Sequence, residues 1–87
     1  MNVSLVIPAY NEREIILDTI REVSAKLAEL TADYEVLIVD DGSTDGMAEA
    51  VRDCGNPRVR LESYSPNHGK GRAVRVGMLA ARGDIIL

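Results

Sequence analysis

The chain has one cysteine and one histidine among its 87 residues, and it has no long apolar run. A lone Cys54 excludes an internal disulfide framework and a cysteine-rich zinc site, and a lone His68 excludes a histidine-rich metal site. Nothing approaches the roughly 18 consecutive apolar residues that a transmembrane helix needs. Residues 1–20 also lack the basic region and cleavage site of a secretion signal, so we expect a cytoplasmic location.

Positive charge is scarce as well. Ten basic residues face fourteen acidic ones, which gives a net charge of −4 and an isoelectric point of about 4.8. So acidic a chain is a poor candidate for binding nucleic-acid phosphates, and no nucleic-acid partner is expected. Because 46% of the residues are apolar and 28% are charged, disorder is excluded and one small domain is expected.

Short apolar runs predict the strands. Residues 3–7 and 34–39 are rich in β-branched side chains and end sharply, the first at Pro8 and the second at an acidic turn, as buried strands do. Residues 59–62 form a weaker third run. Residues 84–87 begin a fourth strand that the chain does not finish.

Helices are predicted between these runs. From Glu12 onward, apolar residues follow one another at intervals of four and three, which places them on one stripe of a helix: Ile16, Ile20, Val23, Leu27 and Leu30. A second helix is expected at residues 46–53, capped by Ser43, Thr44 or Asp45. A third is expected at residues 72–81, with Gly83 as its cap.

This alternation of strands and helices implies right-handed crossovers and a mostly parallel sheet. We therefore predict an α/β fold, the first half of a doubly wound sheet, in a single subdomain over residues 1–87 that is cut off in its fourth strand. Residues 8–12 and 40–45 each follow the carboxyl end of a strand, where such sheets bind ligands. The two loops should be neighbours in space.

Several familiar motifs fail. A phosphate-binding P-loop is excluded because Gly71 follows Lys70 and Tyr64 stands where the first glycine belongs. The turn after the first strand has no glycine, which argues against a dinucleotide site. An EF-hand starting at Asp41 would need a glutamate where Arg52 stands. The acidic pair follows the second strand, not the first, which disfavours a phospho-receiver domain.

Four segments together form a recognisable pattern, although none of them is a diagnostic motif alone. They are Ile-Pro-Ala-Tyr-Asn-Glu at 7–12, Val-Asp-Asp-Gly-Ser-Thr-Asp at 39–45, Asn-His-Gly-Lys-Gly-Arg-Ala-Val-Arg at 67–75, and Ala-Arg-Gly-Asp-Ile-Ile at 81–86. In this order and at these separations they resemble the amino-terminal half of inverting family 2 glycosyltransferases, which have the GT-A fold. The resemblance covers essentially the whole chain. The run from Gly69 to Met78 is most similar to dolichyl-phosphate β-glucosyltransferases, with dolichyl-phosphate mannosyltransferases next.

The resemblance implies the nucleotide-sugar-binding half of an enzyme that transfers a hexose from a UDP-sugar or GDP-mannose to a polyprenyl or dolichyl phosphate, or to a similar saccharide acceptor. It implies that Asp41, or less favourably Asp40, accepts the ring N–H of the base, and that Tyr10 offers the base a flat face. The remaining predicted substrate-binding residues would hold the ribose and the diphosphate or line the site: Pro8, Ala9, Glu12, Val39, Gly69, Lys70 and Arg72.

Each of these side chains also has a structural interpretation. Glu12 can start a helix, and one of Asp40 and Asp41 can serve only as a turn acid. Asp45 is expected to be a helix cap, and His68 a solvated loop residue.

In the family, the fourth strand runs on into an Asp-x-Asp motif that binds a divalent metal, and Leu87 ends this sequence before that motif. The resemblance thus implies Mg²⁺ or Mn²⁺ in the full-length enzyme, with neither catalytic residues nor metal ligands within this chain, which alone should be inactive. Such an enzyme could work at the cytoplasmic face of a membrane. An exposed sheet edge predicts self-association. The alternative is a stand-alone nucleotide-sugar-binding or regulatory module without catalysis.

Overall fold

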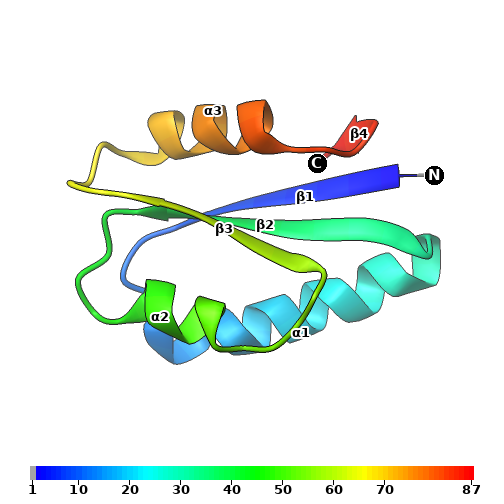
Figure 1. Ribbon diagram of the computed structural model, residues 1–87, viewed down its shortest axis with the longest axis horizontal. Helices are drawn as coiled ribbons and strands as arrows, with labels where there is room; N and C mark the ends of the chain where they lie inside the picture. Colours follow the sequence, from blue (N-terminus) through cyan, green and yellow to red (C-terminus); the bar gives the residue numbers. More distant parts are fainter. Residues whose placement is uncertain (1) are drawn as a thin grey trace.

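The computed structural model describes residues 2–87, which form a four-stranded sheet with helices on both faces (Figure 1). The strands are β1 (Asn2–Ala9), β2 (Asp33–Asp41), β3 (Val59–Tyr64) and β4 (Ile85–Ile86). They lie in the order β3-β2-β1-β4, and every neighbouring pair is parallel. The predicted α/β class, with a parallel sheet wound in both directions from β1, is confirmed.

Three helices connect these strands: α1 (Arg13–Leu30), α2 (Met47–Arg52) and α3 (Lys70–Ala80). Helices α1 and α2 cover one face of the sheet, and α3 covers the other (Figure 1). No helix within residues 2–87 combines the length and the apolar character that crossing a bilayer requires.

The central strand β2 explains why the second apolar run is nearly continuous. Val36 and Ile38 pack into the core cluster beneath α1 and α2, whereas Leu37 and Val39 belong to the cluster beneath α3. Successive side chains of a strand point to opposite faces, so a strand covered on both faces needs apolar residues at every position. All four side chains are fully buried.

The apolar stripe of α1 is shorter than predicted. Ile16, Ile20 and Leu27 are buried, and Val23 packs against them. Leu30, the last residue of the predicted stripe, is 70% exposed. It is the last residue of α1, and β2 begins three residues later at Asp33.

The role predicted for Gly83 as a helix cap is also wrong. The cap of α3 is Ala81, whose backbone N–H donates to the carbonyl of Gly77. Gly83 instead lies against β1, where an added Cβ would come within 2.6 Å of the backbone nitrogen of Ser4. Glycine is therefore required by the close approach of two backbones and not by the end of the helix.

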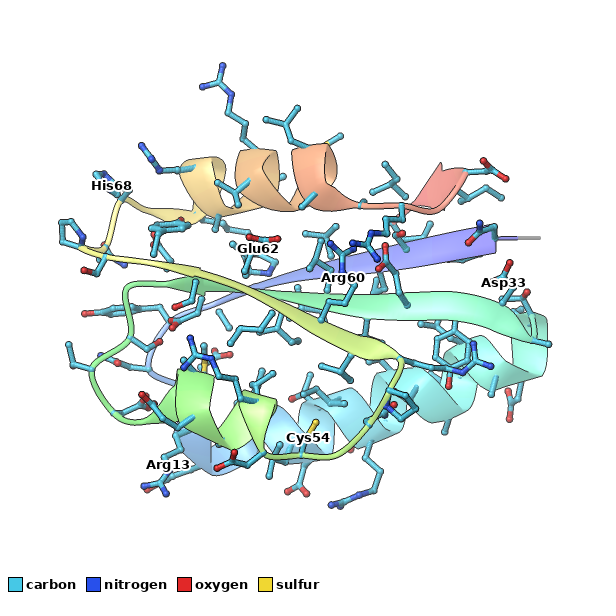
Figure 2. The ribbon with its side chains drawn as sticks, viewed as in Figure 1. Arg13, Asp33, Cys54, Arg60, Glu62 and His68 are labelled. Atoms are coloured by element: carbon cyan, nitrogen blue, oxygen red, sulfur yellow. The ribbon has the colours of Figure 1, made fainter. Side chains whose placement is uncertain are left out.

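A largely buried ion pair fastens the end of α3 to the sheet. Arg60 Nη1 donates to Glu35 Oε1 at 2.7 Å and to the carbonyl oxygen of Ala80 at 3.2 Å. Glu35 Oε2 accepts from the Ser4 hydroxyl and from the backbone N–H of Arg82. Burial disfavours the charged form of Glu35, but these donors outweigh it and lower the pKa of its carboxyl. In Figure 2 Arg60 points toward α3.

One of the two edges of the sheet is formed by β4. Its two residues pair with β1 through Val3 and Ser4, and the hydrogen bonds continue to Leu87. Ile85, Ile86 and Leu87 remain 38%, 39% and 59% exposed. The predicted self-association through this edge stays a prediction.

Candidate binding site at the carboxyl edge of the sheet

The loops that follow β1 and β2 are joined by Asn11. Its backbone N–H donates to Ser43 Oγ at 2.8 Å, and its side-chain oxygen accepts from the backbone N–H of Thr44 at 2.8 Å. Asn11 has a φ of 52°, in the left-handed region that asparagine tolerates better than most residues. The expectation that these two loops are neighbours is confirmed.

The loop before α3 closes on the same edge. Gly42 faces it with a φ of 79°, and a Cβ there would stand 2.5 Å from the backbone nitrogen of Asn67 and 2.7 Å from the carbonyl carbon of Pro66. Figure 2 shows His68 and Arg13 at this end of the molecule and Asp33, which begins β2, at the other. Three loops thus meet where the strands end.

Between these loops lies a cavity of about 260 Å³. It is lined by residues from β1, the loop after it, the end of β2 and the start of α3: Pro8, Ala9, Tyr10, Glu12, Asp41, Asn67, Gly69, Lys70 and Ala73. Seven of these nine were singled out in the sequence as substrate-binding residues. The fold therefore brings most of the predicted site together.

The carboxylate of Asp41 is the most heavily bonded group of the cavity. Its Oδ1 accepts from the backbone N–H of His68 at 2.9 Å. Its Oδ2 accepts from the backbone N–H of Gly69 at 2.8 Å and from Asn67 Nδ2 at 2.7 Å. Asp41 is 4% exposed, and burial by itself would raise its pKa. The side chain of Tyr64 and these N–H donors more than compensate, so the pKa of Asp41 is lowered and the group is a carboxylate.

Tyr64 completes the surroundings of Asp41. Its hydroxyl oxygen is buried and lies beside the Asp41 carboxylate. Burial and the neighbouring Asp41 carboxylate raise the pKa of Tyr64 to about 12. The phenol therefore stays neutral beside the carboxylate.

Asp40 has a different role from Asp41. It is 2% exposed, its Oδ1 accepts from the backbone N–H of Ser43, and its Oδ2 accepts from the Ser63 hydroxyl. These bonds hold the turn after β2 and tie it to β3. Asp40 does not line the cavity, so it is the turn acid that the sequence analysis expected one member of the pair to be.

Two further predicted residues stand outside the cavity lining. Val39 is completely buried beneath α3 beside Ala73. The guanidinium of Arg72 lies 5.4 Å from the centre of the Tyr64 ring, which suits a cation–π contact. Lys70, by contrast, lines the cavity as the first residue of α3 and is exposed.

Two residues of the cavity lining, Asn67 and Ala73, were not among the predicted site residues. Asn67 stood within one of the four segments, in the loop expected before the third helix, with no role assigned to it. Its contact with Asp41 spans 26 positions and has no local sequence signal. Ala73 lines the cavity because a small side chain there lets α3 approach the sheet.

A wider hollow of about 410 Å³ lies beside this cavity, over the start of α1, with Glu12 common to both. Its polar side chains Asn11 and Asp45 are already engaged in hydrogen bonds between the loops. The charged side chains of Glu12, Arg13 and Glu14 also line it, and they are exposed.

The acidic groups of residues 2–87 do not fit a resident metal ion. No three histidine, cysteine, aspartate or glutamate side chains of this part of the chain come together as ligands. Asp40 and Asp41 point their oxygens at N–H and O–H donors, which a cation could not replace without releasing the loops.

A four-stranded parallel sheet with helices on both faces, and with a polar cavity beside the acidic pair that ends β2, has the α/β architecture of the GT-A glycosyltransferases. The family model for glycosyl transferase family 2 matches residues 4–87, so the chain belongs to that family.

Named relatives support the assignment. The chain is 34% identical, over 98% of its length, to the undecaprenyl-phosphate 4-deoxy-4-formamido-L-arabinose transferase of Pseudomonas fluorescens (strain SBW25). It is 36% identical, over its whole length, to the dolichyl-phosphate beta-glucosyltransferase of Drosophila melanogaster. It spans 26% and 29% of these two relatives.

Among solved structures, a mannosyltransferase from Pyrobaculum calidifontis in complex with GDP-Man and Mn²⁺ superposes with a TM-score of 0.80. It is 26% identical to this chain, covers 98% of it, and is matched over 26% of its own length.

Proposed function

We propose that this chain is the nucleotide-sugar-binding part of a glycosyltransferase that transfers a hexose to a polyprenyl or dolichyl phosphate. The observation that carries the proposal is the cavity at the carboxyl edge of the sheet, which combines an exposed aromatic ring, a buried carboxylate and a lysine at a helix amino terminus. A nucleotide sugar needs these three kinds of partner.

Each part of such a donor has a suitable partner among the residues of the cavity. The ring of Tyr10, which is 46% exposed, offers the base an apolar face. Lys70 and the amino terminus of α3 attract the diphosphate, because unpaired backbone N–H groups and a lysine charge act together there. Glu12 is exposed at the cavity rim and can accept from ribose hydroxyls.

The acceptor class rests on the relatives. Two of them are named for transfer to undecaprenyl phosphate or dolichyl phosphate, and both match this chain across nearly its whole length. A divalent metal like the Mn²⁺ of the mannosyltransferase complex would need ligands from outside residues 2–87. The group that deprotonates the acceptor would also have to come from outside these residues. The 87-residue chain alone should therefore bind a donor nucleotide without transferring sugar.

The test is amide NMR of the ¹⁵N-labelled chain during titration with UDP or GDP, each with and without Mn²⁺. We expect shifts concentrated at residues 8–12, 41 and 67–73, with weak affinity and little dependence on Mn²⁺. A well-dispersed spectrum that does not respond to either nucleotide would contradict the proposal. So would shifts confined to the opposite end of the sheet, around Asp33 and Asn56.

A further inference from the structure

The strand β3 forms the second edge of the sheet, on the side opposite to β4. It pairs only with β2, and the backbone N–H of Val36 donates to the carbonyl oxygen of Arg58 at 2.8 Å. Because successive residues of a strand direct their backbone groups to alternate sides, the even-numbered residues of β3 bond β2. The N–H and C=O groups of Leu61 and Ser63 therefore point away from the sheet, where another strand could pair with them.

Few of the devices that protect an edge strand are present in β3. Such strands are commonly very short, interrupted by a bulge, or supplied with proline or lysine. The six residues of β3 include neither proline nor lysine, and their register against β2 runs unbroken from Val59 to Tyr64. Val59 and Leu61 are only partly buried, and both line a hollow of about 290 Å³ whose other walls come from α2 and the loop after it. This edge is long and regular enough to accept a further strand.

The two charged side chains of β3 fit a second copy of the same strand. Arg60 and Glu62 stand on either side of Leu61, and both project to the α3 face of the sheet (Figure 2). When two β3 strands lie antiparallel with Leu61 opposite Leu61, Arg60 of each copy lies opposite Glu62 of the other. Opposite charges in directly opposed positions stabilise a strand pair.

The neighbouring registers are disfavoured by the same charges. A shift by one position in the pairing sets Arg60 opposite Arg60 in one direction and Glu62 opposite Glu62 in the other, and like charges directly opposed destabilise a pair. The sequence of β3 thus selects the register centred on Leu61.

Both charged groups can still accept a partner. The bonds of Arg60 to Glu35 and to the carbonyl oxygen of Ala80 use Nη1 alone. A guanidinium carries further N–H groups on Nε and Nη2. Glu62 takes part in neither of the ion pairs found among residues 2–87.

We propose that two copies of this chain associate through β3, antiparallel and centred on Leu61, so that their sheets become one continuous sheet. The two Leu61 residues exchange N–H···O=C bonds, and each Ser63 N–H donates to the carbonyl oxygen of Val59 in the other copy. The N–H of Val59 is already bonded to the carbonyl oxygen of Asn56 at 3.1 Å. No residue that lines the cavity belongs to β3, so this inference does not depend on nucleotide binding.

Disulfide trapping tests the register. In a Cys54→Ser background, Leu61→Cys sets two thiols opposite each other with Cα atoms about 5.5 Å apart, a distance that a disulfide spans. Mild oxidation should therefore convert most of this variant to a covalent dimer. Val59→Cys in the same background is the matched control. Val59 of one copy faces Ser63 of the other, which leaves the two substituted positions about 14 Å apart, so this variant should stay unlinked.

Charge reversal tests the complementarity without altering the core. Glu62→Arg sets an arginine opposite each Arg60, so the dissociation constant of the dimer, measured by sedimentation equilibrium, should rise by about tenfold or more. Glu29→Arg makes the same change of charge on the exposed side of α1 and should leave the constant unchanged. Ile86→Lys adds a charge at the β4 edge and should also leave it unchanged.

The outcomes that overturn the proposal are distinct from those expected. A folded wild-type chain that is monomeric at millimolar concentration overturns it, and so does a Glu62→Arg variant that dimerises as tightly as the wild type. Equal disulfide linking of Leu61→Cys and Val59→Cys, or no linking of either folded variant, contradicts the register. Dissociation caused by Ile86→Lys and not by Glu62→Arg would show that the copies meet at β4 and not at β3.

Discussion

The backbone N–H of Arg13 donates to Asp45 Oδ2 at 3.0 Å, although 32 positions separate the two residues. The other oxygen of Asp45 accepts from the backbone N–H of Met47, also at 3.0 Å. Arg13 begins α1 and Met47 begins α2, so one carboxylate satisfies N–H groups in the first turns of two helices. The same bonds bring together the two loops that border the cavity.

Replacing this carboxylate should therefore cost more than the loss of one helix cap. We expect Asp45→Ala to lower the free energy of unfolding by about 1–2 kcal/mol, measured by urea denaturation, because both helices lose an acceptor. Asp18→Ala is the control, since it removes only an exposed ion pair with Arg21, worth at most about 0.5 kcal/mol. Equal effects of the two substitutions would show that Asp45 contributes no more than a surface charge.

The sequence predicted the order of the elements because apolar periodicity reports burial directly. The alternation of short β-branched runs with a helical stripe was enough for a parallel sheet, and parallel strands bring their following loops to one edge. That reasoning also placed residues 8–12 beside residues 40–45, as the bonds of Asn11 confirm.

Partners far apart in the sequence could not be predicted in the same way. Nothing local distinguishes Asp40, bonded to Ser63, from Asp41, bonded to the loop before α3. Gly83 follows a helix as a cap would, and only the fold reveals that it lies against Ser4. Burial patterns identify a face of an element, whereas hydrogen-bond partners depend on how the finished loops meet.

The pKa of Glu35 makes the stability of the fold depend on pH. In the folded chain the pKa of Glu35 lies below its ordinary value of 4.5. The ionised carboxylate therefore stabilises the fold fully above pH 4.5, and this stabilisation is lost as the pH falls through the pKa of the folded state. We expect the free energy of unfolding of the wild type to decrease below about pH 4.5 more steeply than that of Glu35→Gln. Urea denaturation at a series of pH values measures this.

Because the pKa of Asp41 is lowered as well, the free energy of unfolding of Glu35→Gln should still decrease at low pH, although less steeply than that of the wild type. Glu29→Gln, on the exposed side of α1, makes the same change in net charge and serves as the control. Parallel pH profiles for wild type and Glu35→Gln would contradict the stabilising role of the bonds between Glu35 and Arg60.

Two glycines of α3 provide a matched test of how closely this helix lies on the sheet. A Cβ at Gly77 would overlap Val6 Cγ1 and approach Val39 Cγ2, whereas a Cβ at Gly71 would meet nothing within 4 Å. We expect Gly77→Ala to destabilise the fold by about 1–3 kcal/mol, because α3 must move away from β1 and β2. Gly71→Ala should be neutral or stabilise by up to about 1 kcal/mol. Thermal unfolding of both variants measures the difference, and a stabilising Gly77→Ala would be inconsistent with the close packing.

Lys70 provides the test that separates diphosphate binding from base binding. It lines the cavity as the first residue of α3, where its charge adds to the partial positive charge of the helix amino terminus. We expect Lys70→Ala to weaken UDP binding by about tenfold, the loss of one charge-assisted contact, and to leave the weaker binding of uridine unchanged. The control is Lys26→Ala, which removes an exposed lysine of α1 far along the sequence from the cavity lining and should alter neither affinity. If Lys70→Ala weakens uridine and UDP by the same factor, then Lys70 supports the shape of the cavity and does not contact the diphosphate.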